Sequence, residues 1–262
     1  MDYYPAILSS GTTTMPSAKR IEQATLSFLL TGIAPLDRKD AMLAICAALT
    51  ADGHVEHSRR VFDFLLKESD RPDPEQMREA ILQTHLFAGY PRALNALASF
   101  KEACKAASNP LSGEIKLRDT PLEGDDMALF RQRGGKLFAL LYANLAPKID
   151  QIARDASPDL GDWAVAEGYG RVLARDILKP RQRSLCILAA LMPLDVLPQL
   201  KGHVQGAVNL GHSAETLWKL YELIPKFFDH MPKSAKTAFE AVLGKQKISD
   251  ADFDQEQKYR WS

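Results

Sequence analysis

A histidine near the start of a predicted helix is the residue best placed in this sequence to do chemistry. His203 lies in the segment Leu178–Leu217, where an apolar helix is expected to break at Pro193 and a second helix to begin near Pro198. The imidazole can then project into the groove between the two helices. Because histidine titrates near physiological pH, His203 could donate a proton or hold a carboxylate group. The alternative is a purely structural histidine that hydrogen-bonds within the core.

A weaker copy of this segment occurs earlier in the chain, from Leu36 to about Met77. It places His57 at the position that matches His203, 146 residues earlier (203 minus 57). The neighbours of His57 are more polar, which makes it the weaker candidate. The copies indicate two tandem repeats packed as one unit. The expected divisions are an N-terminal arm and helix (1–35), a first repeat (36–107), a linker (108–132), a second repeat (133–244) and a loose tail (245–262).

A second pair of candidates precedes the His203 hairpin. Glu167 and Arg171 are four residues apart on one predicted helix, where a solvated ion pair is the simplest interpretation. Gly168 and Gly170 would allow another helix to approach closely. In that case both side chains could line a cleft beside His203, and Arg171 could bind a carboxylate group of a substrate.

Composition limits the possible partners of the chain. Its 262 residues contain 33 basic and 33 acidic side chains, so the formal net charge is zero, which argues against nucleic acid or an anionic membrane as the main partner. No apolar run is long enough for a membrane span and the start lacks a signal-peptide pattern, so we expect a cytoplasmic protein. The three cysteines are expected to be reduced.

No segment shows the alternation of apolar and polar residues that is typical of a strand, which predicts an all-α fold.

Several motifs in this helical sequence resemble those of the carboxymuconolactone decarboxylase family, whose relatives include alkylhydroperoxidase D. They are EGYGRVLARD, LKPRQR, QLKGHVQGAVNLG and SAETL in the second half, and MREAILQTHLFAGYPRALNAL in the first. The resemblance implies an alkylhydroperoxidase D-like fold and a homotrimer or other homo-oligomer. It also implies decarboxylation of a small carboxylated lactone or related acid of aromatic-compound catabolism. We expect no cofactor and no metal, since His54 and His57 could form a metal pair but have no third ligand at helical spacing.

The resemblance also implies roles for individual residues. His203 and Glu167 would be catalytic, and a small-molecule carboxylate would be bound by Arg171, Tyr90, His85 and His57. The expected result is one composite site per chain, in which residues of the second half face the Tyr90 region of the first.

Two departures from the family pattern keep other functions open. The peroxidase branch uses a Cys-x-x-Cys pair just before its histidine, but the matching positions before His203 are Val196 and Gln199. A thiol peroxidase is therefore disfavoured, although it remains an alternative. Many relatives carry a glutamate where this chain has Ser184. A non-catalytic oligomeric binding protein is the third interpretation.

Overall fold

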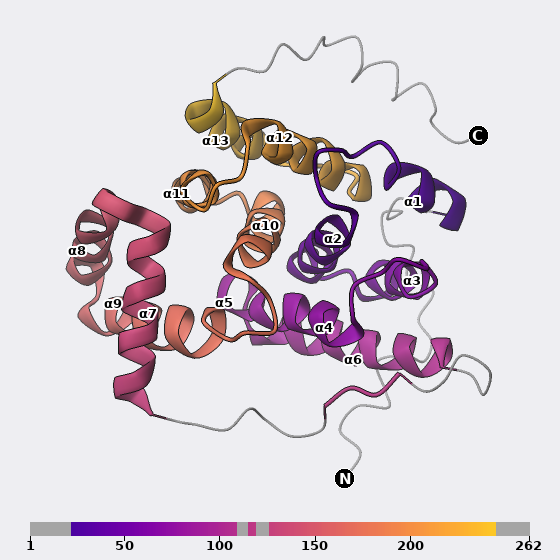
Figure 1. Ribbon diagram of the computed structural model, residues 1–262, viewed down its shortest axis with the longest axis horizontal. Coiled ribbons are helices and arrows are strands. Elements are labelled where there is room, and N and C mark those ends of the chain that lie inside the picture. The colour runs from indigo at the N-terminus through magenta and orange to yellow at the C-terminus, as the bar shows by residue number, and fades with distance from the viewer. Residues whose placement is uncertain (1–21, 109–114, 119–125, 245–262) are drawn as a thin grey trace.

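The computed structural model describes residues 22–108, 115–118 and 126–244, and this part of the chain forms helices and no strands (Figure 1). The predicted all-α class is confirmed. The expected extended arm and the loose tail lie outside the described residues. In the first half the helices are α1 (Gln23–Leu29), α2 (Arg38–Asp52), α3 (Val55–Leu65), α4 (Pro74–Gln83), α5 (His85–Ala88) and α6 (Tyr90–Ala107).

The second half begins with the helices α7 (Met127–Tyr142), η1 (Ala143–Leu145), α8 (Ala146–Ala156), α9 (Pro158–Trp163) and η2 (Ala164–Leu173). It continues with α10 (Pro180–Leu191), η3 (Met192–Leu194), α11 (Leu197–Asn209), α12 (Ala214–Leu223), η4 (Ile224–Phe227) and α13 (Lys233–Leu243). None of the helices in the described ranges is long and apolar enough to cross a lipid bilayer.

Two helices, α2 and α10, pack against each other at the centre of the molecule (Figure 1). Every residue from Ala41 to Ala51 in α2 is buried, and so is every residue from Arg183 to Leu191 in α10. A helix that is apolar on all sides must be covered on all sides, which is why the other helices surround this pair. At its edge, the Gln182 amide donates a 2.8 Å hydrogen bond to the Asp40 carboxylate.

The remaining helices surround each central helix in the same order. In the first half, α2 contacts α3 and α4, and α6 packs on both α3 and α4. In the second half, α10 contacts α11 and α12, and α13 packs on both α11 and α12. The order of helices and their packing partners therefore correspond between the halves. The boundaries of the two repeats stay a prediction.

In the second half, α7 and η2 pack against each other through glycines. A Cβ atom on Gly134 would lie 1.9 Å from the Val165 carbonyl oxygen, and one on Gly170 would lie 2.0 Å from the Phe130 oxygen. The two backbones are therefore in direct contact, which only glycine permits. Close approach was expected at Gly168 as well, but no neighbour lies nearer than 4.0 Å there.

Some helix limits were predicted from capping residues and others were not. The sequence Asp73-Pro74-Glu75 is typical of a helix start, and α4 does begin there, with a reciprocal capping box between Asp73 and Gln76. The apolar pattern predicts that this helix reaches Phe87, yet it breaks at Thr84 and restarts as the short helix α5. The pair Gly134-Gly135 could interrupt a helix, but α7 runs through both. The π-helical geometry of η2 was not predicted.

Candidate functional site

The candidate site is a group of aromatic rings around His203, here called the His203 cluster. It comprises His203 on α11, Phe87 on α5, and Phe138, Tyr142 and Tyr169 on α7 and η2. The His203 ring lies edge-on to Phe87, with centroids 5.8 Å apart, and 6.0 Å from the ring of Tyr142. Phe87 belongs to the first half and the other four to the second. Both halves therefore contribute to the surroundings of this histidine.

Two tyrosines and a phenylalanine extend the cluster away from His203. The hydroxyl groups of Tyr142 and Tyr169 are 2.8 Å apart and hydrogen-bonded. The ring of Phe138 lies 4.7 Å from that of Tyr142 and 5.1 Å from that of Tyr169. Burial raises the pKa of both tyrosine hydroxyls, so both remain protonated at neutral pH. One hydroxyl donates to the other, and the wall beside His203 is uncharged.

The imidazole of His203 is neutral in this environment. The residue is 7 % exposed, and burial alone lowers its pKa to about 4. Within the described part of the chain, His203 makes ring contacts but no hydrogen bond. At neutral pH the free site therefore holds no imidazolium to act as a proton donor. The neutral ring can still donate one hydrogen bond and accept another.

His57 occupies a matching place but already has a hydrogen-bond partner. Its Nε2 lies 3.0 Å from the carbonyl oxygen of Phe227, at the end of η4, and the residue is 4 % exposed. Phe227 lies 140 residues after Phe87 (227 minus 87), so each histidine contacts the equivalent phenylalanine of the other half. Burial lowers the pKa of His57 as well. The hydrogen bond to a backbone oxygen gives His57 a structural role. Its predicted role in binding a carboxylate stays a prediction.

Glu167 and Arg171 lie on the surface of η2. Both residues are exposed, whereas Tyr169 between them is 9 % exposed and points into the cluster. Side chains two residues apart on a helix point to roughly opposite sides. Tyr169 therefore faces the His203 cluster, the side on which Glu167 and Arg171 were expected. The guanidinium group of Arg171 instead lies over the Phe130 ring, 6.0 Å from its centroid. Glu167 and Arg171 do not lie beside His203 as expected. Their catalytic and binding roles remain predictions.

Tyr90 and His85 flank the phenylalanine that contacts His203. Their rings lie 4.9 Å apart, and Nδ1 of His85 is 2.7 Å from the Leu82 carbonyl oxygen. Tyr90 is 68 % exposed, so it is at the surface and not inside the cluster. The first half therefore reaches His203 through Phe87, and the predicted binding roles of Tyr90 and His85 remain untested.

A buried ionic network, not anticipated from the sequence, joins the two halves. The Arg183 guanidinium on α10 donates 2.8 Å hydrogen bonds to the Glu79 carboxylate and to the Gln83 side-chain oxygen, both on α4. Arg175 forms a second ion pair with Glu79 at 3.1 Å. Arg183 and Glu79 are each 2 % exposed. No signal in the sequence indicates this network, because Glu79 and Arg183 each have charged or polar neighbours in their helices.

Metal and thiol chemistry find little support in the described residues. No group of three or more histidine, cysteine, aspartate or glutamate side chains there is arranged to hold a metal ion. All three cysteines are free and buried. Burial raises the pKa of the Cys46 and Cys186 thiols, which disfavours the reactive thiolate form.

Comparison with known proteins changes the identification suggested by the sequence motifs. No family model matches the chain. The chain is 33 % identical to Peroxisomal protein 2 of Saccharomyces cerevisiae over 163 residues, which cover 54 % of this chain and 56 % of the yeast protein. It is 31 % identical to Peroxisomal protein 2 of Schizosaccharomyces pombe over 142 residues, or 53 % of this chain and 62 % of that protein. The chain thus matches somewhat more than half the length of these relatives.

These findings correct three predictions. The assignment to the carboxymuconolactone decarboxylase family is wrong, because no family model supports it and the relatives have a different name. The decarboxylase function inferred from that assignment is therefore also wrong, and the peroxidase alternative gains no support. The expected cytoplasmic location is contradicted as well, since both relatives are named as peroxisomal proteins.

Proposed function

We propose that this protein acts in peroxisomes, on a small organic molecule that contacts the His203 cluster. The names of the two relatives support the location. The observation that carries the proposed site is the state of His203, a buried neutral imidazole that makes no hydrogen bond within the described residues. Because no described residue hydrogen-bonds to this ring, its nitrogens are available to donate to and accept from a ligand that reaches them.

The surroundings of His203 favour a flat and uncharged ligand. Phe87 and Tyr142 offer ring surfaces on which a planar molecule can pack. Burial is the only cause of the lowered His203 pKa, and no neighbouring charge contributes to it. A charged ligand would lose its hydration without gaining a counter-charge here. A carbonyl group that accepts a hydrogen bond from the imidazole fits this environment better than a carboxylate does.

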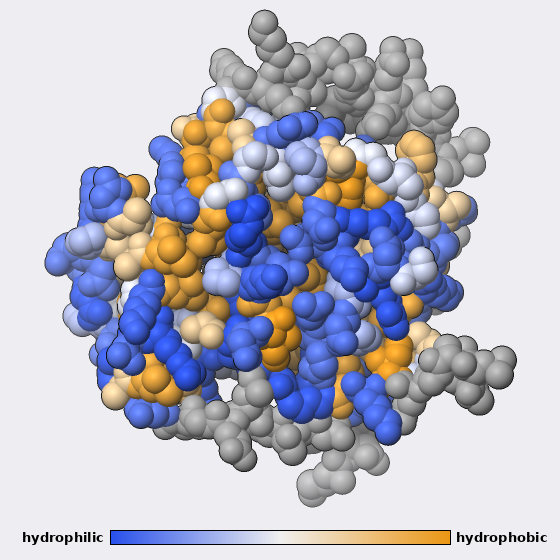
Figure 2. Space-filling view, in the orientation of Figure 1, coloured by the Kyte–Doolittle hydropathy of each residue, from blue (hydrophilic) through white to orange (hydrophobic). Residues whose placement is uncertain are grey.

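Access to the cluster is consistent with the surface of the molecule. In Figure 2, apolar residues reach the surface between α7 and α11, the two helices that carry Tyr142 and His203. His203 itself retains 7 % of its surface exposed. An apolar surface at this place suits a ligand with an aromatic body.

The ligand proposal is tested with benzamide, a planar uncharged carbonyl compound, and with benzoate as its charged counterpart. Isothermal titration calorimetry on the full chain should detect benzamide, with benzoate bound more weakly. His203→Phe keeps a ring of similar size but removes the hydrogen bond, and should weaken benzamide binding about tenfold. His230→Gln changes an exposed histidine and should have no effect. Equal affinity of the wild type and His203→Phe for benzamide would refute the proposal.

The location is tested by fluorescence microscopy in yeast cells that carry a red peroxisomal marker. The chain is fused to a green fluorescent protein at its N-terminus in one strain and at its C-terminus in another, because a tag can mask a targeting signal. Coincidence with the marker in either strain is the expected result. Diffuse fluorescence in both strains would contradict a peroxisomal location.

We also propose that the protein forms a homo-oligomer, as the sequence led us to expect. Support comes from large apolar residues that are 43–59 % exposed along α7, η1, α8 and α9, namely Leu140, Leu145, Ile152, Leu160 and Trp163. A second copy of the chain could cover such a surface. Light scattering on the purified protein should give a multiple of the 29.1 kDa chain mass. A monomer at micromolar concentration would refute this proposal.

A further inference from the structure

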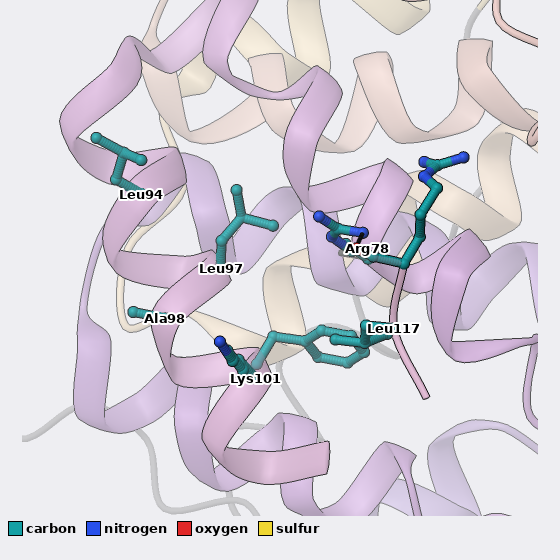
Figure 3. Close-up of a pocket in the computed structure, with 8 residues that line it drawn as sticks. Arg78, Leu94, Leu97, Ala98, Lys101 and Leu117 are labelled. Atoms are coloured by element: carbon teal, nitrogen blue, oxygen red, sulfur yellow. Dashed lines mark hydrogen bonds between the residues drawn. The ribbon is translucent and has the colours of Figure 1, made fainter. Parts of the chain in front are cut away.

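A pocket between α4, α6 and residues 115–118 has the composition of a binding site for an amphipathic anion. Its volume is about 380 Å³, near the small end of the range for small-molecule sites. Among the described residues, the lining combines apolar side chains with three cations and includes no carboxylate. The lining residues are Arg78, Leu94, Leu97, Ala98, Phe100, Lys101, Leu117 and Arg118 (Figure 3).

Within the part of the chain that the structure describes, the positive charge of the pocket exceeds the negative charge available to balance it. Glu75 serves both arginines of the lining, with Oε1 3.3 Å from Arg78 Nη1 and Oε2 3.9 Å from Arg118 Nη2. Arg175 adds a further cation nearby: burial is the main cause of its lowered pKa, and Arg78 and Arg118 lower it further, against the opposing effect of Glu79. A concave surface lined by charges of one sign concentrates the field and attracts the opposite charge.

The arginines are held in place before any ligand binds. Arg78 Nη1 donates a 2.8 Å hydrogen bond to the carbonyl oxygen of Arg118, and the backbone N–H of Arg118 donates to the Glu75 carboxylate. The Nε atom of Arg118 is buried and has no hydrogen-bond partner among the described residues. A buried unpaired donor costs free energy unless something pairs with it.

The apolar part of the lining defines the rest of the ligand. Phe100 is fully buried, whereas Leu94 at the other end is 49 % exposed. In Figure 3, Leu94, Leu97 and Lys101 all project from α6 on one side, with Arg78 and Leu117 on the other. An apolar body covering the leucines would remove their surface from water, while an acidic group reached the cations. Arginine recognises a carboxylate well because its planar fork matches the two oxygens.

We propose that this pocket binds an amphipathic carboxylate, with its acidic group at Arg78, Lys101 and Arg118 and its apolar body along Leu94 and Leu97. None of these residues belongs to the His203 cluster, so the proposal does not rest on the function suggested for that cluster. A carboxylate ligand was expected from the sequence, but at other residues. The pocket supplies the counter-charge that the His203 cluster lacks.

Sodium octanoate is the probe for this proposal, and calorimetry on the full chain at low salt is the measurement. Octanoate should bind. Octan-1-ol, which has the same body without the charge, and inorganic phosphate, which has charge without the body, should each bind at least about tenfold more weakly, since a hydrogen bond to a charged group contributes on that scale. No binding of octanoate at millimolar concentration would overturn the proposal. Binding of either control compound as tight as that of octanoate would also overturn it.

Three variants locate the bound octanoate. Lys101→Gln should weaken its binding about two- to fivefold, as expected for an exposed charge, and Leu94→Asn should weaken it at least about threefold through lost apolar contact. Lys105→Gln is the matched control, because Lys105 lies one turn further along α6, pairs with Glu102 and does not line the pocket. Both Lys101 and Leu94 are exposed, so neither change should disturb folding. Equal effects of Lys101→Gln and Lys105→Gln would refute the assigned site.

Discussion

Two neighbouring glycines in α7 should respond in opposite ways to the same substitution. A Cβ atom on Gly134 would lie 1.9 Å from the Val165 oxygen and 2.9 Å from the Gly170 nitrogen, whereas one on Gly135 would have no neighbour within 4 Å. Ordinary van der Waals contact begins near 3.4 Å. Gly134→Ala therefore requires the backbones of α7 and η2 to separate by more than an ångström. Gly135→Ala requires no movement.

The magnitudes follow from two opposing effects. Alanine favours a helix over glycine by about 1 kcal/mol, so Gly135→Ala should raise the free energy of unfolding by about 0.5 to 1 kcal/mol. Gly134→Ala has the same intrinsic gain, but the overpacking of two backbones should cost about 3 kcal/mol or more, for a net loss of about 2 kcal/mol. The separation of α7 from η2 would also displace Tyr142 and Tyr169, which carry the wall of the His203 cluster.

Urea unfolding of the full chain, followed by far-ultraviolet circular dichroism, measures both free energies. Gly135→Ala is the internal control, since it tests helix propensity at the adjacent position. If the two variants differed in unfolding free energy by less than about 0.5 kcal/mol, within the scatter of surface substitutions, the close packing of α7 on η2 would be refuted.

Three further predictions concern stability. Glu79→Gln should lower the free energy of unfolding by about 3 kcal/mol or more in urea titrations, because it leaves two arginines without their buried counter-charge; a loss under about 1 kcal/mol would contradict a buried network. Asp73→Ala should cost about 1 kcal/mol by removing the α4 cap, and an unchanged midpoint would refute that cap. The pKa of His203 falls from 6.5 in the unfolded chain to about 4 in the folded protein, so the free energy of unfolding should be highest above pH 6.5 and should fall on acidification, by about 3 kcal/mol at pH 4 and below. In His203→Gln the free energy of unfolding should fall less steeply as the pH is lowered. The same dependence on pH in the variant and the wild type would contradict the lowered pKa.

The helices were largely predictable because their signals are local. Apolar periodicity and capping residues act within a few residues of chain, and Asp73 and Ser213, residue types typical of helix starts, do cap α4 and α12. The π-helical turns of η2 were not predictable in this way. They change the angular position of each side chain, and Tyr169 faces the cluster where Glu167 and Arg171 were expected to lie near it.

The candidate site was only partly predictable because it depends on distant contacts. His203 was identified from its position in a helix, but its partner Phe87 is 116 residues away (203 minus 87) and belongs to the other half. The hydrogen bond between His57 Nε2 and the Phe227 carbonyl oxygen, which has no counterpart at His203 among the described residues, spans 170 residues. No local pattern encodes such pairs. The motifs that suggested the wrong family consist of helix-forming residues with scattered glycines, a composition that unrelated helical proteins share.

The central claim is that His203 is a neutral buried imidazole able to pair with a ligand. The most direct test is nitrogen-15 NMR of the histidine side chains of the full chain across pH, with and without benzamide, using His203→Phe to assign the signal. We predict that His203 titrates near pH 4 without ligand and that at pH 7 benzamide shifts its ring signals and not those of His57. A His203 that titrates near its ordinary 6.5, or whose signals do not respond to benzamide, would contradict the account.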